Sequence, residues 1–286
     1  MKYQTPAVWI ISDIHLDIWI HYGWKEDLPD LSQYYDPDRQ NVYLILGDTL
    51  NGLPLRESQL FAQGMVQEAM RRLSSQGDVF FVLGNHEHYN GVFEDTKRKF
   101  DGFFDDMPNV VVIDTAECFM YGDTALIVGS NWPAMSLSDY LMHTTDQPAF
   151  LRANGTHVIF GDLEEKGKIH KAAMSEAFLE VAFSKMAFNN LIFGTHFGCA
   201  ENPSQREIYP NINPYFDPPP HMALIGAVQD YIEKTDCSVI WCYGHSHINE
   251  NRESIYGGVI RTNQIGYPKE ATKLGITNPF TFKRVL

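Results

Sequence analysis

The sequence predicts an α/β fold in which buried strands alternate with covering helices. Seven short runs of apolar, β-branched and aromatic residues have strand length, and their near-continuous apolarity is typical of strands buried on both faces. Longer segments with apolar residues at helical spacing lie between several of them. This alternation of strands and helices indicates a layered α/β architecture. Of the 286 residues, 44% are hydrophobic, which is enough for a substantial core and argues against a disordered chain.

The predicted strands, in chain order, are Ala7–Ile11, Val42–Leu46, Val79–Leu83, Val110–Ile113, Ala125–Val128, Leu191–Phe193 and Ser238–Tyr243. The predicted helices are Glu57–Gln76, Leu163–Lys185 and His221–Lys234. The length allows one large domain or two small ones. Because there is no internal repeat and no clear linker, we expect residues 1–286 to form a single domain.

Two segments do not fit this alternation. Residues 131–161 are polar, and they are either a cap-like insertion that overhangs a site or a surface connection. Residues 201–220 contain six prolines, which predicts a stiff and irregular loop.

The charge balance constrains the partners. With 22 Lys and Arg against 36 Asp and Glu, the formal net charge is −14. An acidic surface repels long phosphate backbones, so we expect no long nucleic acid as a partner. A phosphorylated substrate would need a local source of positive charge.

Targeting and redox features are lacking. The N-terminal stretch has no signal-peptide cleavage site, and no apolar run is long enough to span a membrane. The four cysteines have no CxxC spacing, and buried thiols are the expected state. These observations predict a cytoplasmic protein without a membrane partner, while the oligomeric state stays open.

Polar residues follow five of the predicted strands at the point where each strand ends. These endings are Ser12-Asp13-Ile14-His15, Gly47-Asp48, Gly84-Asn85-His86-Glu87, Gly194-Thr195-His196 and Gly244-His245-Ser246-His247. In α/β sheets, ligands bind at the carboxyl ends of strands. One such ending would more often be a turn or a helix cap. Five together indicate a site.

The residue types at these endings suit divalent metals such as manganese, iron or zinc. Imidazole, carboxylate and amide oxygen are appropriate ligands for these ions, and no thiolate is needed. Asp13 and His15 are two positions apart on an extended segment, so both side chains leave the same face, and His245 and His247 repeat this spacing. The glycines beside them allow sharp turns or a close approach of the backbone to an ion.

Taken in order, the motifs DxH, GD, GNHE, a single histidine after a strand, and GHxH resemble the calcineurin-like metallophosphoesterase superfamily. The resemblance extends from about Val8 to Tyr267. Finer features are similar to its bacterial and phage Ser/Thr-phosphatase-like branch, namely SDIHLD, GNHEHY, Gly129-Ser130-Asn131-Trp132 and Asn263-Gln264-Ile265-Gly266-Tyr267. The resemblance implies a four-layer α/β/β/α sandwich with mixed sheets and a dinuclear metal centre.

The resemblance also implies a role for eight residues. One metal would be held by Asp13, His15 and His247, and the other by Asn85, His196 and His245. Asp48 would bridge the two metals, and His86 would lie beside them as the catalytic residue. Manganese is the favoured ion, with iron, zinc, nickel and cobalt as alternatives.

Two positions depart from the family pattern or blur it. Many members have an acidic residue or Asn three positions after the GD, and here Asn51 fills that place without a clear role. Members of the branch often have two consecutive histidines with a proline two positions later, whereas this chain has Thr195-His196-Phe197-Gly198. His196 is therefore the single ligand candidate there.

The expected function is a metal-dependent phosphoesterase acting on phosphomonoesters or small phosphodiesters, with a nucleotide or a phosphoprotein as possible substrates. Two divalent ions can clamp a phosphoryl oxygen and acidify a bridging water, and the resulting hydroxide would attack phosphorus. His86 would assist the leaving group. The carboxylate of Glu87 or Asp17 would orient a ligand histidine or the catalytic histidine by a hydrogen bond. Alternatively, both are acidic loop residues without such a role.

Two alternatives to this function remain. The first is a catalytically idle member of the family that serves as a binding or scaffold module, although none of the eight positions is lost. The second is a nuclease acting on short oligonucleotides, against which the acidic charge counts.

Two other features are not assigned to the catalytic site. An aromatic cluster of Trp19, His21, Tyr22 and Trp24 would pack in the core or in a loop, or else stack on a substrate ring. Asp162, with Glu165 three residues later, is typical of a helix start.

Overall fold

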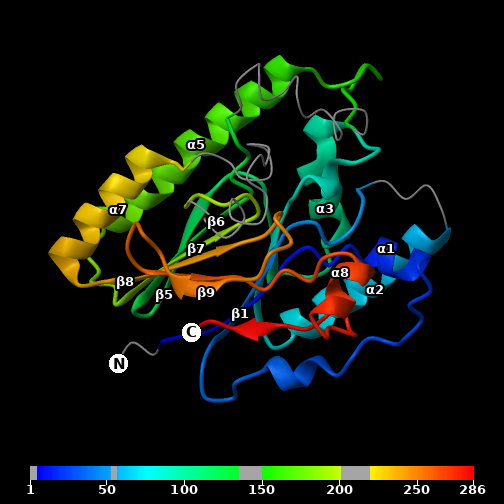
Figure 1. Cartoon of the computed structure of the whole chain (residues 1–286), viewed down its shortest axis with the longest axis horizontal. Coiled ribbons are helices and arrows are strands. Elements are labelled where there is room, and N and C mark those ends of the chain that lie inside the picture. The colour runs from blue at the N-terminus through cyan, green and yellow to red at the C-terminus, as the bar shows by residue number, and fades with distance from the viewer. Residues whose placement is uncertain (1–4, 53–56, 135–149, 201–219) are drawn as a thin grey trace.

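Two β-sheets stack face to face between two layers of helices (Figure 1). The structure is a computed structural model, and it describes residues 5–52, 57–134, 150–200 and 220–286. The first sheet has the order β11-β1-β2-β3-β4. Its strands are β1 (Ala7–Ile11), β2 (Asn41–Leu46), β3 (Gly77–Val82), β4 (Val110–Ile113) and β11 (Lys283–Arg284).

The second sheet has the order β5-β6-β7-β8-β10-β9. Its strands are β5 (Glu117–Tyr121), β6 (Thr124–Gly129), β7 (Asn190–Thr195), β8 (Ser238–Tyr243), β9 (Asn251–Glu253) and β10 (Val259–Arg261). In each sheet the central strands are parallel and edge strands are antiparallel, at β11, β5 and β9. Both sheets are therefore mixed, as predicted.

Helices cover the outer face of each sheet. The first sheet is covered by α1 (Leu16–His21), α2 (Glu57–Ser74), α3 (Thr96–Phe103) and α8 (Pro268–Lys273), and the second by α5 (Phe160–Ala182) and α7 (Met222–Thr235). Short 3-10 turns lie at η1 (Leu31–Tyr34), η2 (His86–His88) and η3 (Phe93–Asp95).

Three buried apolar clusters separate these layers. One lies between the sheets and joins residues such as Leu44 and Leu46 of β2 to Val128 and Ile192 of the second sheet. The other two lie between each sheet and its own helices. Every residue of β2 and β6 is buried, because both strands are covered on both faces. The four-layer α/β/β/α sandwich is thus confirmed.

Each predicted strand and helix is present, with boundaries shifted by a few residues. The helix expected from Leu163 begins at Phe160, and Asp162 lies in its first turn, where it accepts a hydrogen bond from the Ile159 N–H at 2.9 Å. The segment 201–219 lies outside the described residues, and so does 135–149 within the expected insertion.

The described part of the expected insertion packs against the loop that follows β3. Phe150 and Val158 are buried, and Leu151 exchanges backbone hydrogen bonds with Gly91 and Phe93. Among the described helices, none is both long and apolar enough to cross a bilayer. The cysteines are free thiols, of which Cys199, Cys237 and Cys242 are buried.

A buried histidine lies inside an aromatic cluster at this place. The His88 ring is 4.6 Å from the Phe93 ring centroid and 5.5 Å from that of Trp132. Neither ring nitrogen has a hydrogen-bond partner among the described residues. Burial lowers the pKa of His88 to about 3, and the charge of Lys166 acts in the same direction. Nearby Asp114 acts in the opposite direction, and His170 lowers the pKa further.

We predict that His88 makes the protein less stable in acid. The unfolded chain takes up a proton near pH 6.5, whereas folded His88 stays neutral until about pH 3. Neutral His88 therefore costs no stability above pH 6.5. Below pH 6.5 the unfolding free energy falls by up to about 1.4 kcal/mol per pH unit, because the unfolded state binds a proton that the folded state does not. Replacing His88 by Phe should flatten the pH dependence of the unfolding free energy, measured in urea between pH 7 and pH 4.5. The exposed His157→Phe is the control, and equal slopes in all three proteins would contradict the prediction.

Candidate metal centre

The eight residues predicted from the sequence come together at one edge of the two sheets. They follow β1, β2 and β3 of the first sheet and β7 and β8 of the second. All except His247 are buried, and the His247 side chain is only 16% exposed. The structure thus places polar side chains from five strand ends in one cluster: Asp13, His15, Asp48, Asn85, His86, His196, His245 and His247.

The first group consists of Asp13, His15 and His247. The Nε2 atoms of the two histidines are 3.0 Å apart, and Nε2 of His247 is 3.5 Å from Oδ1 of Asp13. One potential ligand atom from each residue lies within 4.8 Å of the others. This is a spacing at which the three side chains could hold one ion.

The second group is centred on Asn85. Its Oδ1 atom is 3.0 Å from Nε2 of His196 and 3.0 Å from Nδ1 of His245. The Asn85 side-chain N–H donates to the hydroxyl of Tyr89 at 3.1 Å, which turns the oxygen toward the histidines. An amide oxygen and two imidazole nitrogens therefore converge.

Asp48 lies between the two groups. Its Oδ1 atom is 3.4 Å from Nε2 of His196, and its Oδ2 atom is 4.0 Å from Nε2 of His15. This single carboxylate thus faces both groups, as a bridging ligand must.

The donor set fits divalent cations. The Nδ1 atom of His196 is 2.9 Å from the Leu46 carbonyl oxygen, and Nδ1 of His247 is 2.7 Å from Oε2 of Glu270. When each Nδ1–H donates to its oxygen, Nε2 presents a lone pair to the centre. Converging lone pairs of nitrogen and oxygen repel one another unless a cation lies among them. Nitrogen and oxygen donors of this kind suit manganese, iron or zinc.

The backbone of the predicted ligands is unusual as well. Five of them have a positive φ between 44° and 70°, in the left-handed region: Asp13, His15, Asp48, His245 and His247. The expectation that Asp13 and His15, and likewise His245 and His247, lie on extended segments is therefore wrong. For a non-glycine residue such a φ costs about 1–2 kcal/mol. Such conformations concentrate at functional sites, where the surrounding structure holds them.

Glycine at two positions permits the close approach of the strand ends. A Cβ atom on Gly47 would overlap the ring of His196, and one on Gly84 would overlap the carboxylate of Asp48. Gly47 also has a φ of 83°. At these two positions glycine leaves room for the side chains of His196 and Asp48, and the φ of Gly47 agrees with the expected sharp turn.

His86 faces the same centre. Its Nε2 atom is 3.9 Å from Oδ2 of Asp48, and its ring centroid is 4.4 Å from that of His15. Its Nδ1 atom is 2.9 Å from Oδ1 of Asn51. Asn51, which had no clear role in the sequence, therefore holds the His86 ring in place.

Two acidic residues accept hydrogen bonds from groups that form the site. Glu87 is buried, and its carboxylate accepts hydrogen bonds from the backbone N–H groups of Gly84, Asp48, Thr49 and Leu50 at 2.7 to 3.3 Å. Glu270 accepts from His247, as described above. Asp17 instead accepts a hydrogen bond from Gln59.

The surroundings of Glu87, Glu270 and His247 shift their pKa values. Burial raises the pKa of Glu87 to about 7, although the four N–H donors act to lower it. The hydrogen bond with His247 holds the pKa of Glu270 below its usual value. Burial lowers the pKa of His247, but the Glu270 hydrogen bond and the Asp13 charge outweigh it, so the pKa is raised.

A family model described as calcineurin-like phosphoesterase matches residues 6–249. The chain belongs to this family. The resemblance to the calcineurin-like superfamily that the motifs indicated is thereby confirmed. Members of the calcineurin-like phosphoesterase family bind divalent metals, and the Asp and His clusters of this chain could hold such ions. No curated protein matches the chain.

Solved structures resemble the chain to different degrees. A phosphopantetheinyl hydrolase from Mycobacterium tuberculosis superposes with a TM-score of 0.58 at 16% identity, covering 100% of this chain and 97% of that one. A dimetal phosphatase from Danio rerio gives 0.48 at 14% identity, with coverages of 92% and 88%. A putative 5'-nucleotidase from Staphylococcus aureus gives 0.44 at 15% identity, and the match covers 91% of this chain but 49% of that one.

We predict that Glu87→Gln destabilises the protein and weakens the metal site. An amide has one acceptor oxygen, and its NH₂ group would face N–H donors, so part of the buried donor cluster would lose its partner. Each unsatisfied buried donor costs about 1–3 kcal/mol. Urea unfolding of the two proteins measures the loss. The exposed Glu233→Gln on α7 is the control, and equal stability of Glu87→Gln and the native protein would contradict the prediction.

Proposed function

We propose that this protein hydrolyses phosphomonoesters or small phosphodiesters with two divalent metal ions, of which manganese is the favoured one. The observation that carries the proposal is the convergence of two donor groups on one shared carboxylate, that of Asp48. Membership of a phosphoesterase family supports the reaction class.

Bound ions would polarise the phosphoryl group and acidify a water molecule. The side chains have separate tasks in this proposal. One ion would be held by Asp13, His15 and His247, and the other by Asn85, His196 and His245. Asp48 would be a ligand of both ions. His86, which Asn51 holds with Nε2 toward the centre, would contact the ester and assist the departing oxygen.

The charge of the chain supports small substrates. A net charge of −14 disfavours long polyanions, while two divalent ions would outweigh Asp13 and Asp48 within the site. Positive charge for a phosphate ester therefore does not have to come from Lys or Arg. Because all eight predicted residues are present and converge, an active enzyme is favoured over an idle scaffold.

The test combines metal analysis with an activity screen. We expect elemental analysis of the purified protein to find about two divalent ions per chain. p-Nitrophenyl phosphate or its bis ester should be hydrolysed with Mn²⁺ added, and a chelator should abolish the activity reversibly. A short oligonucleotide in the same screen tests nuclease activity. Absence of bound metal together with inertness toward both esters would overturn the proposal.

A further inference from the structure

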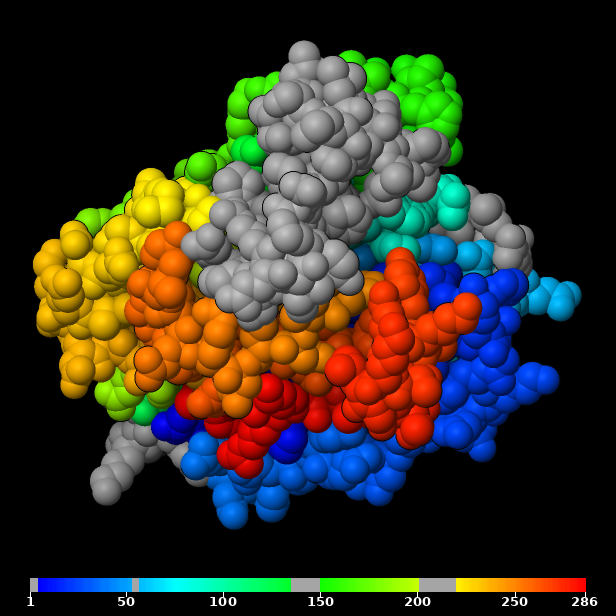
Figure 2. Space-filling view, in the orientation of Figure 1, coloured from blue at the N-terminus to red at the C-terminus, as the bar shows by residue number. Residues whose placement is uncertain are grey.

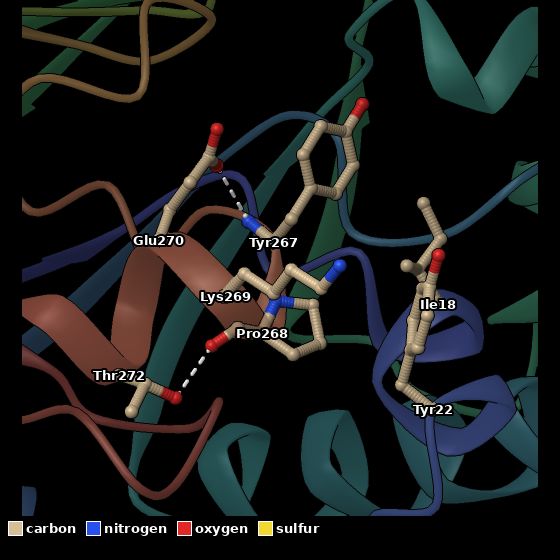
Figure 3. A pocket seen from close by; sticks show the side chains of 7 residues that line it. All are labelled: Ile18, Tyr22, Tyr267, Pro268, Lys269, Glu270 and Thr272. Atoms are coloured by element: carbon tan, nitrogen blue, oxygen red, sulfur yellow. Dashed lines mark hydrogen bonds between the residues drawn. The ribbon is translucent and has the colours of Figure 1, made fainter.

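A cavity of about 620 Å³ lies between α1 and α8 (Figure 3). Ile18 of α1 and Tyr22, which directly follows α1, form one side, and Tyr267 and Pro268 at the start of α8 face them from the other. On the molecular surface, the segment around α8, in red, lies beside the N-terminal segment, in blue (Figure 2). A cavity of this volume is in the range typical of small-molecule sites.

The cavity adjoins the candidate metal centre. The Tyr267 ring centroid is 4.6 Å from that of His15 and 4.8 Å from that of His247. Glu270 also lines the cavity, and its carboxylate is the group 2.7 Å from Nδ1 of His247. Two residues that line the cavity, Tyr267 and Glu270, are thus in direct contact with predicted ligands.

The walls are held by the bonds that position the first ligand group. Nε1 of Trp19 on α1 donates to the Gly266 carbonyl at 3.1 Å, which ties α1 to the turn before α8. The Gly266 N–H in turn donates to the Asp13 carbonyl at 2.9 Å. The cavity is therefore preformed at a fixed position relative to the metal centre. This reduces the conformational entropy that is lost when a ligand binds.

The chemistry of the walls selects the ligand. Tyr22 is 66% exposed, so its ring is open to a partner. Flat aromatic faces prefer planar rings, stacked or edge-on. Lys269 is the one basic residue among the lining residues, and Glu270 is already engaged with His247. These walls suit a planar apolar group better than a second anionic one.

We propose that this cavity binds the alcohol portion of the phosphate ester and selects planar aromatic groups larger than one ring. This inference rests on the proposed function, because it names the substrate class of the same site. Tyr22 is the main specificity-determining residue, since its exposed ring and Tyr267 approach the bound group from opposite sides.

The test compares 1-naphthyl phosphate with phenyl phosphate, whose leaving groups are of similar acidity. We expect kcat/KM to be about fivefold to tenfold higher for the naphthyl ester, and Tyr22→Ala to abolish most of this ratio. Tyr35→Ala, an exposed tyrosine of the same chain outside the cavity, should leave the ratio unchanged.

A binding measurement separates this inference from the proposed function. We expect the non-hydrolysable 1-naphthylmethylphosphonate to bind the native protein more tightly than Tyr22→Ala in calorimetric titration. If the phosphonate binds in this way while neither ester is hydrolysed, the proposed function fails and the cavity assignment stands. If both esters are hydrolysed with equal kcat/KM and Tyr22→Ala changes nothing, the cavity assignment fails alone.

Discussion

Replacing Asp48 by alanine is expected to empty both metal positions and to lower kcat/KM roughly a thousandfold. The carboxylate faces both donor groups, at 3.4 Å from Nε2 of His196 and 4.0 Å from Nε2 of His15. Bound metals supply several kcal/mol of transition-state stabilisation, and about 1.4 kcal/mol corresponds to a factor of ten. Metal content and hydrolysis of p-nitrophenyl phosphate, both measured on the purified variant, test this expectation.

A more conservative variant separates ligation from folding. Asp48 Oδ1 accepts the His86 backbone N–H at 2.9 Å, so alanine removes a structural bond as well. Asp48→Asn keeps an acceptor and tolerates the φ of 54°, but it loses the charge. Asp236→Asn is the matched control, because Asp236 has a φ of 58° and lies at the end of α7, away from the site. If Asp48→Asn retained both ions and native activity, the bridging role would be wrong.

The sequence was sufficient to predict the longer parallel strands, because most of their residues are buried and their apolar runs are almost unbroken. The strands β5, β9, β10 and β11 were not predicted. In β5 every residue is exposed or half-buried without a strict alternation, and β9, β10 and β11 have only 3, 3 and 2 residues, so none of these strands leaves a periodic signal. Pairing with a neighbouring strand, rather than local sequence, makes these segments extended.

The short helices were missed for a similar reason. Both α1 and α8 have 6 residues, which is too few for a helical repeat of apolar positions. The aromatic cluster between Trp19 and Trp24 is divided between the core and the surface. Trp19 packs in the core, with Trp24 against it, whereas Tyr22 is exposed beside the cavity.

The predicted ligands were identifiable because each directly follows a strand. Their supporting residues were harder to identify, because support comes from contacts that are distant in sequence. Glu270 is 23 residues from His247, and Asn51 is 35 residues from His86. Pro268 followed by Glu270 is typical of a helix start, and it was the one local signal near Glu270. Nothing in the sequence connected that helix with His247.

Replacing His86 by alanine is expected to leave both metals in place and to lower kcat by about 10²- to 10⁴-fold. The ring faces Asp48 and His15 without belonging to either proposed ligand group, and Asn51 holds its far side at 2.9 Å. Asn51→Ala should release the ring and lower kcat by a smaller factor, about tenfold to a hundredfold, again without metal loss.

The double variant distinguishes positioning from an independent role. If Asn51 acts through His86, then Asn51→Ala should have almost no further effect once His86 is alanine. The exposed His157→Ala controls for the loss of an imidazole elsewhere on the chain. Nε2 of His86 lies close enough to His15 and Asp48 for the three to hold an ion themselves. Loss of metal from His86→Ala would therefore show that His86 is a metal ligand. The proposal that His86 acts on the leaving group without binding metal would then be wrong.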